Sequence, residues 1–335
     1  MSDFLTLGIE SSCDETSASV VRDGREILSN IISSQINTHK KYGGVVPEIA
    51  SRMHLEAINA IIKEALDEAG VKADAIDLLA VTKGPGLVGA LLVGISAAKA
   101  LSLALNKPMI GVNHMEGHIC ANYLAYQDLR PPFIALVVSG GHTYLCEVKD
   151  FVEYEVIGRT RDDAAGESFD KVARSLGLGY PGGPEIEKAA RKGKHTIDFP
   201  KSMMEKGNYE FSFSGLKTAV LNHLNTEKMA KRKIIIEDLA RSFQDTVVET
   251  LSFKTFNLLE EKNMNKLVLS GGVAANSALR EKMEIEAKNR GINLYFPPLS
   301  LCTDNASMIA SAGYYRYMNG DRDDAYLKVY PNLEL

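Results

Sequence analysis

The chain has 335 residues, enough for about two domains and a large core. Hydrophobic residues make up 45% of it and charged residues 24%, ordinary values that exclude a disordered, collagen-like or coiled-coil protein. The formal net charge is -5, so any contact with nucleic acid has to come from a local basic patch. The four cysteines form no CxxC pair, which argues against a zinc ribbon and a disulfide framework. The first ten residues lack the basic and apolar regions of a secretory signal, so the sequence predicts a cytoplasmic protein.

The first half of the chain predicts alternating strands and helices. Strands are expected at residues 4–10 and 17–21, and an Asp-Gly turn leads from the second into a third strand. A helix is expected at residues 47–69, because a proline stands in its first turn and a glycine directly after its end. The half ends with a strand at 78–82, a helix at 87–105 and a strand at 109–112.

The helix expected at 87–105 is nearly all apolar and almost long enough to cross a bilayer. Lys99 inside it would cost roughly 2.5–3.5 kcal/mol at the bilayer centre. Its small residues suit close packing against protein, and the helix follows a loop that closes a short strand, as in α/β folds. We therefore expect a helix that packs within the fold, and no membrane.

The second half begins in the same way as the first. GIESSCDETSASVV and VVSGGHTYLCEV each read as a strand, a turn of small residues and a second strand. Such turns expose backbone N–H groups that can hold a phosphate, although either one alone is more typical of an ordinary hairpin. A third turn, LSGGVAAN, follows a strand and opens a helix, which suits a nucleotide's phosphate or ribose. Three such turns on a duplicated chain resemble the actin, Hsp70 and sugar-kinase superfamily, in which two related lobes clamp a nucleotide.

These patterns predict an α/β protein with two duplicated lobes of the actin, Hsp70 and sugar-kinase type. The N-terminal lobe is expected at residues 1–112 and the C-terminal lobe at 113–335, the latter including the motif NHMEGH and its candidate metal site. From about residue 159 to residue 235 the pattern changes to a helix at 162–176, a Gly/Pro loop and a polar stretch. We interpret this segment as an insertion in the second lobe.

The motif NHMEGH places two histidines, His114 and His118, on one face of a helix, at a spacing that suits a metal ion. The alternative is two polar residues at a helix start. Zinc peptidases carry a glutamate directly after the first histidine, whereas Glu116 stands about 200° round the helix from His114, which excludes that class. Imidazoles with one carboxylate suit iron, zinc or another first-row ion. Asp304 is one candidate for the third ligand, although a helix N-cap is an equally good role for it.

Several polar residues lie near the candidate turns. Asp14 and Glu15 stand in the first turn, either as groups that act on a nucleophile or as turn acids exposed to water. Asp170 and Glu187 lie beside glycine-rich loops and are unremarkable on their own. The run KMAKRK at 228–233 is either solvated surface or a contact for tRNA or another polyanion.

Taken together, these motifs resemble the bacterial TsaD family of tRNA N6-adenosine threonylcarbamoyltransferases, once described as O-sialoglycoprotein endopeptidases of the Gcp family. The resemblance extends from about residue 5 to residue 318, in order along the chain. The blocks that carry it are GIESSCDET, GGVVPEIASRMH, TKGPGLVGALLVG, NHMEGH, VVSGGHT, DDAAGESFDK, FSFSGLKTA, LSGGVAANSALR and CTDNASM.

The resemblance implies transfer of the threonylcarbamoyl group from threonylcarbamoyl-adenylate to tRNA, with release of AMP. The acceptor is the N6 amine of the adenosine 3′ of the anticodon, in tRNAs that read codons beginning with A. It implies that His114, His118 and Asp304 hold one iron(II) ion, with zinc or another divalent ion as alternatives. Bacterial members work with TsaB and TsaE and use adenylate made by TsaC. The turn formed by Val137, Val138, Ser139, Gly140 and Gly141 would face the phosphate and acyl end of the adenylate, and Asp170, Gly183, Glu187 and Asn276 would hold its ribose and adenine.

Some questions stay open at this point. The acceptor amine is a poor nucleophile, so we expect Asp14 or Glu15 to help remove its proton, but neither spacing nor resemblance decides between them. A kinase or ATPase of the same superfamily would use the same turns on ATP, although such enzymes hold magnesium through carboxylates and phosphates rather than two histidines. A non-catalytic binding subunit is the third class, and the intact motifs argue against it.

Overall fold

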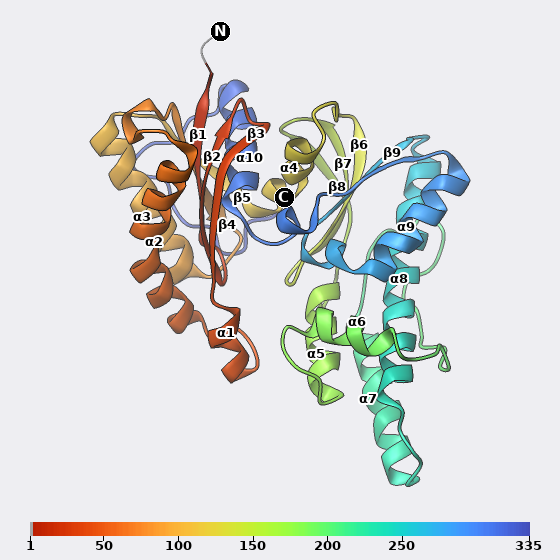
Figure 1. The fold of residues 1–335 in the computed structure, drawn as a ribbon. Coiled ribbons are helices and arrows are strands. Elements are labelled where there is room, and N and C mark those ends of the chain that lie inside the picture. The colour runs from red at the N-terminus through yellow and green to blue at the C-terminus, as the bar shows by residue number, and fades with distance from the viewer. Residues whose placement is uncertain (1–2) are drawn as a thin grey trace. The chain divides into compact units, whose positions relative to one another are not determined.

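The computed structural model describes residues 3–335, which form two compact units (Figure 1). The first unit comprises the described residues of Met1–Pro131 together with Lys149–Tyr154 and Pro297–Leu335. The second comprises Pro132–Val148 and Glu155–Phe296. This division does not follow the boundary that we expected after residue 112, because the C-terminal segment returns to the first unit.

Helix α10 (Ala306–Met318) accounts for this return. It packs against strand β1 (Leu5–Glu10) and helix α4 (His114–Ala125). Gly8 allows the close approach, since a Cβ at this position would lie 2.2 Å from the carbonyl oxygen of Ala306. The motif NHMEGH at the start of α4 consequently belongs to the first unit and not to a C-terminal lobe.

The first sheet has its five strands in the order β3-β2-β1-β4-β5. Strand β1 pairs antiparallel with β2 and parallel with β4, and β4 pairs parallel with β5. Helix α2 (Pro47–Ala69), which has the predicted bounds, leads from β3 to β4, and α3 (Val88–Leu105) connects the parallel strands β4 and β5. The remaining strands are β2 (Glu15–Arg22), β3 (Glu26–Ser34), β4 (Leu78–Gly84) and β5 (Met109–Asn113).

The second sheet repeats this topology with the order β8-β7-β6-β9-β10. Strand β6 pairs antiparallel with β7 and parallel with β9, which pairs parallel with β10. Helices α8 (Ile236–Glu261) and α9 (Ser277–Arg290) take the places of α2 and α3, so the predicted duplication is confirmed. The strands are β6 (Phe133–Val138), β7 (Thr143–Asp150), β8 (Glu153–Arg159), β9 (Lys266–Ser270) and β10 (Asn293–Tyr295).

An insertion separates β8 from α8 in the second unit. It contains the helices α5 (Ala165–Ser175), α6 (Gly182–Ala190) and α7 (Ser214–Met229). The corresponding stretch of the first unit, between β3 and α2, holds α1 (Ile36–His39) and a short 3-10 turn. The insertion lies within the predicted range of 159–235.

Helix α3 is long and apolar enough to cross a membrane, judged by length and composition alone, and 28% of it is buried inside the structure. It connects β4 to β5 and packs beside α2, which is the place that the βα pattern predicts. Gly94 serves close packing, because a Cβ there would lie 2.4 Å from Oγ of Ser11.

The carboxyl ends of parallel strands meet at one edge of each sheet, where α/β folds bind their ligands. In the first unit, β1 ends at Glu10 and β5 ends at Asn113, directly before α4. In the second unit, β6 ends at Val138 and β9 at Ser270, directly before two of the glycine turns. The turns after β1, β6 and β9 and the motif NHMEGH are therefore positioned at these two edges.

Candidate metal centre and nucleotide-binding turns

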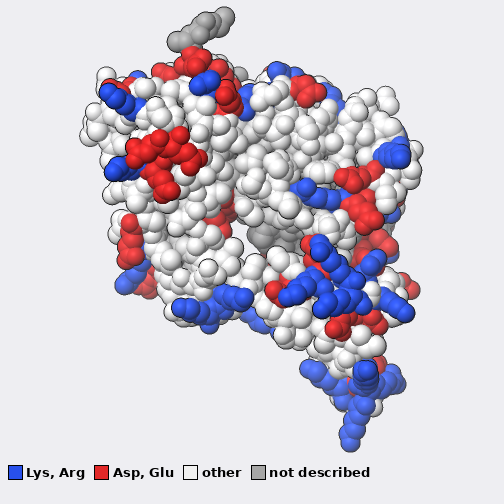
Figure 2. Space-filling model, viewed as in Figure 1, with Lys and Arg blue, Asp and Glu red and all other residues white. Residues whose placement is uncertain are grey.

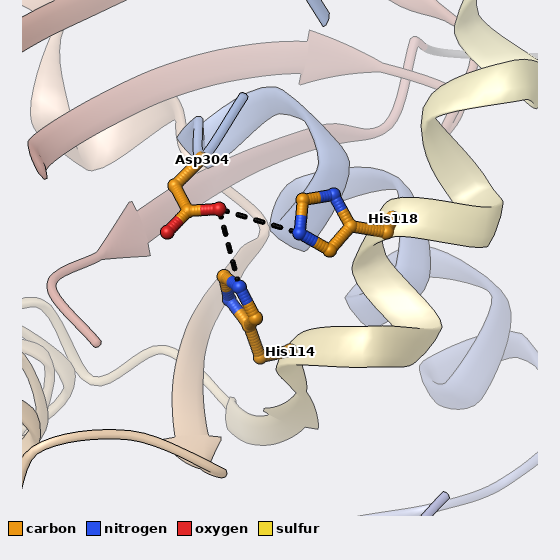
Figure 3. A group of neighbouring side chains, drawn as sticks. All are labelled: His114, His118 and Asp304. Carbon is orange, nitrogen blue, oxygen red and sulfur yellow. Dashed lines mark ion pairs between the residues drawn. The ribbon is translucent and has the colours of Figure 1, made fainter. Parts of the chain in front are cut away.

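The motif NHMEGH forms the junction of β5 and α4. Asn113 ends the strand and caps the helix, its Oδ1 accepting a hydrogen bond from the backbone N–H of Met115 at 2.8 Å. His114 and His118 follow on one helix face, as their spacing predicts, with ring centroids 4.7 Å apart. Nε2 of each ring faces Oδ1 of Asp304, at 3.2 Å and 3.3 Å (Figure 3).

Asp304 completes a group of three ligating atoms within 4.8 Å of one another, which can hold a metal ion. The N-cap role that the sequence offered for it belongs instead to Asn305, whose Oδ1 accepts from the backbone N–H of Met308 at 3.1 Å. Asp304 is therefore free to face the histidines. Two imidazoles and one carboxylate are a donor set typical of first-row divalent ions, so the residues fit such an ion.

The buried carboxylate of Glu10 contacts His114 at Nδ1, the ring nitrogen that does not face Asp304. Its Oε2 lies 2.9 Å from Nδ1 of His114 and accepts a hydrogen bond from Oγ1 of Thr82 at 2.6 Å. The backbone N–H of Ser12 donates to Oε1 at 2.5 Å. A carboxylate that accepts the Nδ1 proton leaves Nε2 as the ligating nitrogen. Glu10 is not among the residues predicted from the sequence, although a carboxylate that ends a largely apolar strand is a usable signal.

Burial and mutual attraction set the protonation of the group. Burial alone would lower the pKa of His114, but the carboxylates of Asp304 and Glu10 raise that pKa well above its usual value. Burial opposes the charge of Asp304, yet His114 keeps the pKa of this carboxyl far below its ordinary range. Burial lowers the pKa of His118, which favours the neutral imidazole that metals bind, and its Nδ1 makes no hydrogen bond. Metal binding here competes with the proton on His114.

Asp14 and Glu15 form a buried pair at the start of β2, with 8% and 9% of each residue exposed. Glu15 is hydrogen-bonded to Asp14, and Oγ of Ser34 donates to its Oε1 at 3.0 Å. Burial, together with the negative charges of Asp304 and Asp14, raises the pKa of Glu15 to about 9. These residues are therefore not turn acids exposed to water. Glu15 also lies near enough to Asp304 for an electrostatic interaction between the two carboxyl groups. Their catalytic role stays a prediction.

The turn after β6, which contains Gly140 and Gly141, borders open space on one side. Ser139 closes the turn: its backbone N–H donates to the carbonyl of His142 at 2.9 Å, and its Oγ accepts from the N–H of His142 at 3.1 Å. A Cβ placed on Gly140 or Gly141 would meet no atom within 4 Å. Backbone N–H groups beside open space suit a phosphate. Val137 and Val138, which precede the turn, are buried in the sheet.

Two other glycines bring neighbouring segments against this turn. A Cβ on Gly166, in the first turn of α5, would lie 2.4 Å from the carbonyl oxygen of Ser139. A Cβ on Gly271, whose φ is +88°, would lie 2.4 Å from the carbonyl oxygen of Val138. The N-terminus of α5 and the turn after β9 therefore lie directly beside the turn after β6. Such an arrangement favours a bound anion.

Among the other predicted adenylate-binding residues of this unit, Asp170 lies within α5 and Glu187 within α6, and each hydrogen-bonds to the start of another helix. Oδ1 of Asp170 accepts from the backbone N–H of Gly182 at 2.6 Å. Gly183 follows, and a Cβ on it would meet no atom within 4 Å. Oε1 of Glu187 accepts from Oγ of Ser277 at 2.6 Å, which ties α6 to the start of α9. Asp170 and Glu187 each have a structural role that sequence alone does not reveal.

Asn276 is the N-cap of α9. Its Oδ1 accepts from the backbone N–H of Leu279 at 3.0 Å, and its Nδ2 donates to Oε1 of Gln244 at 3.0 Å. Capping accounts for the residue type at this position. A role toward a nucleotide stays a prediction for Asn276.

The predicted residues fall into two sets, one in each unit. The predicted metal ligands and the pair of Asp14 and Glu15 lie in the first unit, and all the predicted adenylate-binding residues lie in the second. Glu116 stands apart from both sets, because its carboxylate pairs with Arg316 at 2.6 Å. This arrangement agrees with the argument from spacing that excludes a zinc peptidase.

Comparison with known proteins shows to which family the chain belongs. The family model of TsaD, described as tRNA N6-adenosine threonylcarbamoyltransferase, matches residues 26–311. A relative of the same name from Clostridioides difficile (strain 630) is 58% identical over 336 residues, covering 100% of this chain and 99% of its own length. The chain belongs to the TsaD family. It is thus a transferase of the acyltransferase type, and the resemblance found from its motifs is confirmed.

Solved structures show the fold class of this TsaD family member. Component A of (R)-2-hydroxyglutaryl-CoA dehydratase from Acidaminococcus fermentans superposes with a TM-score of 0.55 at 14% identity, covering 94% of this chain and 98% of that one. The ROK hexokinase from Thermus thermophilus gives a TM-score of 0.50 at 17% identity, covering 95% and 100%. At these identities the likeness concerns the fold alone. The fold is of the actin, Hsp70 and sugar-kinase type, as the three turns of small residues predicted.

Proposed function

We propose that the chain transfers the threonylcarbamoyl group from threonylcarbamoyl-adenylate to the N6 amine of the adenosine 3′ of the anticodon, in tRNAs that read codons beginning with A, and releases AMP. The group of two buried histidines, His114 and His118, with the half-buried Asp304, formed by two motifs of the family, is the observation that carries the proposal. Kinases of this fold class hold magnesium through carboxylates and phosphates. Two imidazoles at the metal centre favour the acyl transfer.

The metal proposed for this centre is one iron(II) ion per chain, with zinc as the alternative. Two histidines and one carboxylate with open positions are typical of iron(II) sites. When bound, such an ion polarises a carbonyl and offsets developing negative charge. Glu10 supports this function by fixing the orientation of His114 and leaving its Nε2 to the metal.

The adenylate is proposed to bind at the turns of the second unit. The open backbone of Ser139, Gly140 and Gly141 suits its phosphate and acyl end, because N–H groups fixed beforehand stabilise the charge that the leaving phosphate gains. For the ribose and adenine we propose Asp170, Gly183, Glu187 and Asn276, with Val137 and Val138 supporting the turn.

Asp14 and Glu15 are proposed to act on the acceptor amine, with unequal roles. Because the pKa of Glu15 is raised to about 9, its carboxyl holds a proton at pH 7, and glutamine imitates that neutral form. We expect Glu15→Gln to keep most of the transferase activity, whereas Asp14→Asn loses about 100-fold, the usual contribution of a general base. Measuring kcat for both variants at pH 7 checks this assignment, and equal losses would contradict it.

The proposed partners are TsaB, TsaE and tRNA, with TsaC as the source of the adenylate, and the proposed location is the cytoplasm. The surface of helices α2 and α3 supports the proposal of a protein partner. Large apolar side chains there are exposed to solvent, namely Leu55, Val88, Leu92 and Leu103. Exposed apolar surface of this kind marks protein interfaces.

The basic run at the end of α7 is proposed to contact tRNA. Lys228, Lys231, Arg232 and Lys233 are exposed, and Figure 2 shows Lys and Arg gathered at the free end of this helix. Reversing the charges of Lys231, Arg232 and Lys233 is expected to weaken tRNA binding. The slope of log affinity against log salt should fall by roughly one unit per lost phosphate contact.

Binding measured at several salt concentrations checks this surface. Reversal of Lys63 and Lys72, which are exposed on the other unit, changes the net charge in the same direction and serves as the control. We expect that control to leave the salt slope unchanged. Equal slopes for the wild type and the α7 variant would show that the run is solvated surface.

The reaction itself is tested by nucleoside analysis. The chain is incubated with threonylcarbamoyl-adenylate and unmodified tRNA, with and without the partners. We expect threonylcarbamoyl-adenosine in the digested tRNA, and none when another base replaces the acceptor adenosine. A chain that binds the adenylate yet modifies no tRNA, even with every partner present, would favour a non-catalytic subunit.

A further inference from the structure

Helix α4, which carries His114 and His118, and helix α10, which follows Asp304, also meet at a second point near the C-terminal end of α10. Helix α4 carries His114 and His118, Asp304 lies just before α10, and the two helices pack against each other (Figure 1). Asp304 precedes the first turn of α10 and Arg316 lies in its last turn, with about 15 Å of helix between Ala306 and Arg316 at 1.5 Å per residue. At the far end, Arg316 pairs with Glu116, which α4 carries between its two histidines.

The ion pair at this second point has a fixed geometry. Glu116 is buried, and its Oε2 accepts a hydrogen bond from Nε of Arg316 at 2.6 Å. Its Oε1 accepts one from the hydroxyl of Tyr154 at 3.3 Å. Nη1 of Arg316 donates to Asp321 at 3.0 Å. A planar guanidinium between two carboxylates has one favoured orientation, so this contact is directional.

Between the two points, Gly117 allows a close approach of the helices. A Cβ on Gly117 would lie 2.8 Å from Cδ1 of Ile309 and 3.2 Å from Cγ of Met308. The backbone of α4 therefore lies directly on the side chains of α10. The rings of Tyr123 on α4 and Tyr315 on α10 also meet edge to face, with centroids 5.2 Å apart. Within this packing, the ligand group lies toward the start of α10 and the Glu116–Arg316 pair toward its end, so the two together restrict how one helix rotates on the other.

We propose that the Glu116–Arg316 ion pair positions the metal ligands: it fixes the crossing of α10 over α4 and so places Asp304 against His114 and His118. The inference rests on the proposed metal centre. A buried ion pair is satisfied in only one arrangement of its two side chains. Apolar side chains of similar volume can pack in several arrangements and give the fold equal or greater stability. The pair thus contributes more to the fixed positions of the metal ligands than to the stability of the fold.

Metal affinity and thermal stability, measured on the same metal-free protein, separate this role from a structural one. Zinc alone is the probe, in competition with a chelating dye. We expect Glu116→Gln to lower zinc affinity by about 10- to 100-fold, the usual effect of losing an outer-sphere partner, and to lower Tm, because Arg316 is left without its buried partner. The double variant Glu116→Met with Arg316→Met should regain most of the Tm but not the zinc affinity.

Lys254→Met is the matched control. This buried cation of the second unit donates to the carbonyls of Met203 and Asn208, so its loss lowers Tm without touching α4 or α10. We expect it to bind zinc as the wild type does. Wild-type zinc affinity in the double variant, or a zinc affinity that follows Tm in every variant, would overturn the positioning role. A wild-type chain that binds neither zinc nor iron(II) would refute the metal centre itself, and the positioning role with it.

Discussion

Replacing His118 by alanine is expected to remove about one metal ion per chain and most of the transferase activity while the fold persists. The ring supplies one of three ligands, and two remaining ligands bind a divalent ion poorly. His114→Ala should lose the same metal and activity at a greater cost in stability. It leaves the buried carboxylate of Glu10 without its partner, which costs about 3 kcal/mol.

Elemental analysis and thermal unfolding of the purified variants check this expectation. The matched control is His195→Ala. His195 also faces two carboxylates, Asp198 and Asp245, each at 3.1 Å, but it lies in the second unit. We expect this variant to keep its metal. Unchanged metal content in both His114→Ala and His118→Ala would refute the assignment of the ligands.

Replacing Gly140 by valine is expected to abolish transfer at little cost to folding. A Cβ at this position meets no atom within 4 Å, and the φ of Gly140 lies outside the left-handed region, so the backbone tolerates a side chain. The added methyl groups would occupy the open space that we assign to the adenylate's phosphate. A loss of at least about 100-fold in kcat/KM is expected, equivalent to about 2.7 kcal/mol of transition-state stabilisation.

Gly271→Ala provides the contrast. Its φ of +88° and the 2.4 Å approach to the carbonyl oxygen of Val138 make any side chain strained at that position. We expect this variant to lower Tm clearly, and Gly140→Val to leave Tm within a few degrees of the wild type. Calorimetric titration with AMP should show lost binding in the folded Gly140→Val protein. Wild-type AMP binding and transfer in that variant would remove the turn from the adenylate site.

The fold was largely predictable because local patterns and global topology agree in this chain. The proline at the start of α2 and the glycine after its end fix that helix from both sides. The two similar segments around the first turns correspond to two sheets with the same strand order. The boundary between the units was not predictable, because the packing of α10 on β1 and α4 joins segments far apart in the sequence.

The candidate metal centre was predictable in part. The spacing of His114 and His118 on one helix indicates a ligand pair, and this requires no tertiary structure. Asp304 had an equally good local role as an N-cap, and only the structure shows that Asn305 takes it. Glu10 and Arg316 act through contacts with α4, which no periodicity encodes.

The most direct test of the proposed function counts both products of one reaction. The chain and its partners receive threonylcarbamoyl-adenylate, tRNA and ATP labelled on its γ-phosphate. Acyl transfer predicts AMP from the adenylate and modified adenosine in equal amounts, with no labelled phosphate on any acceptor. Transfer of the γ-phosphate to a small-molecule acceptor at a comparable rate, without modified tRNA, would contradict the proposed function and assign the chain to the kinases of its fold class.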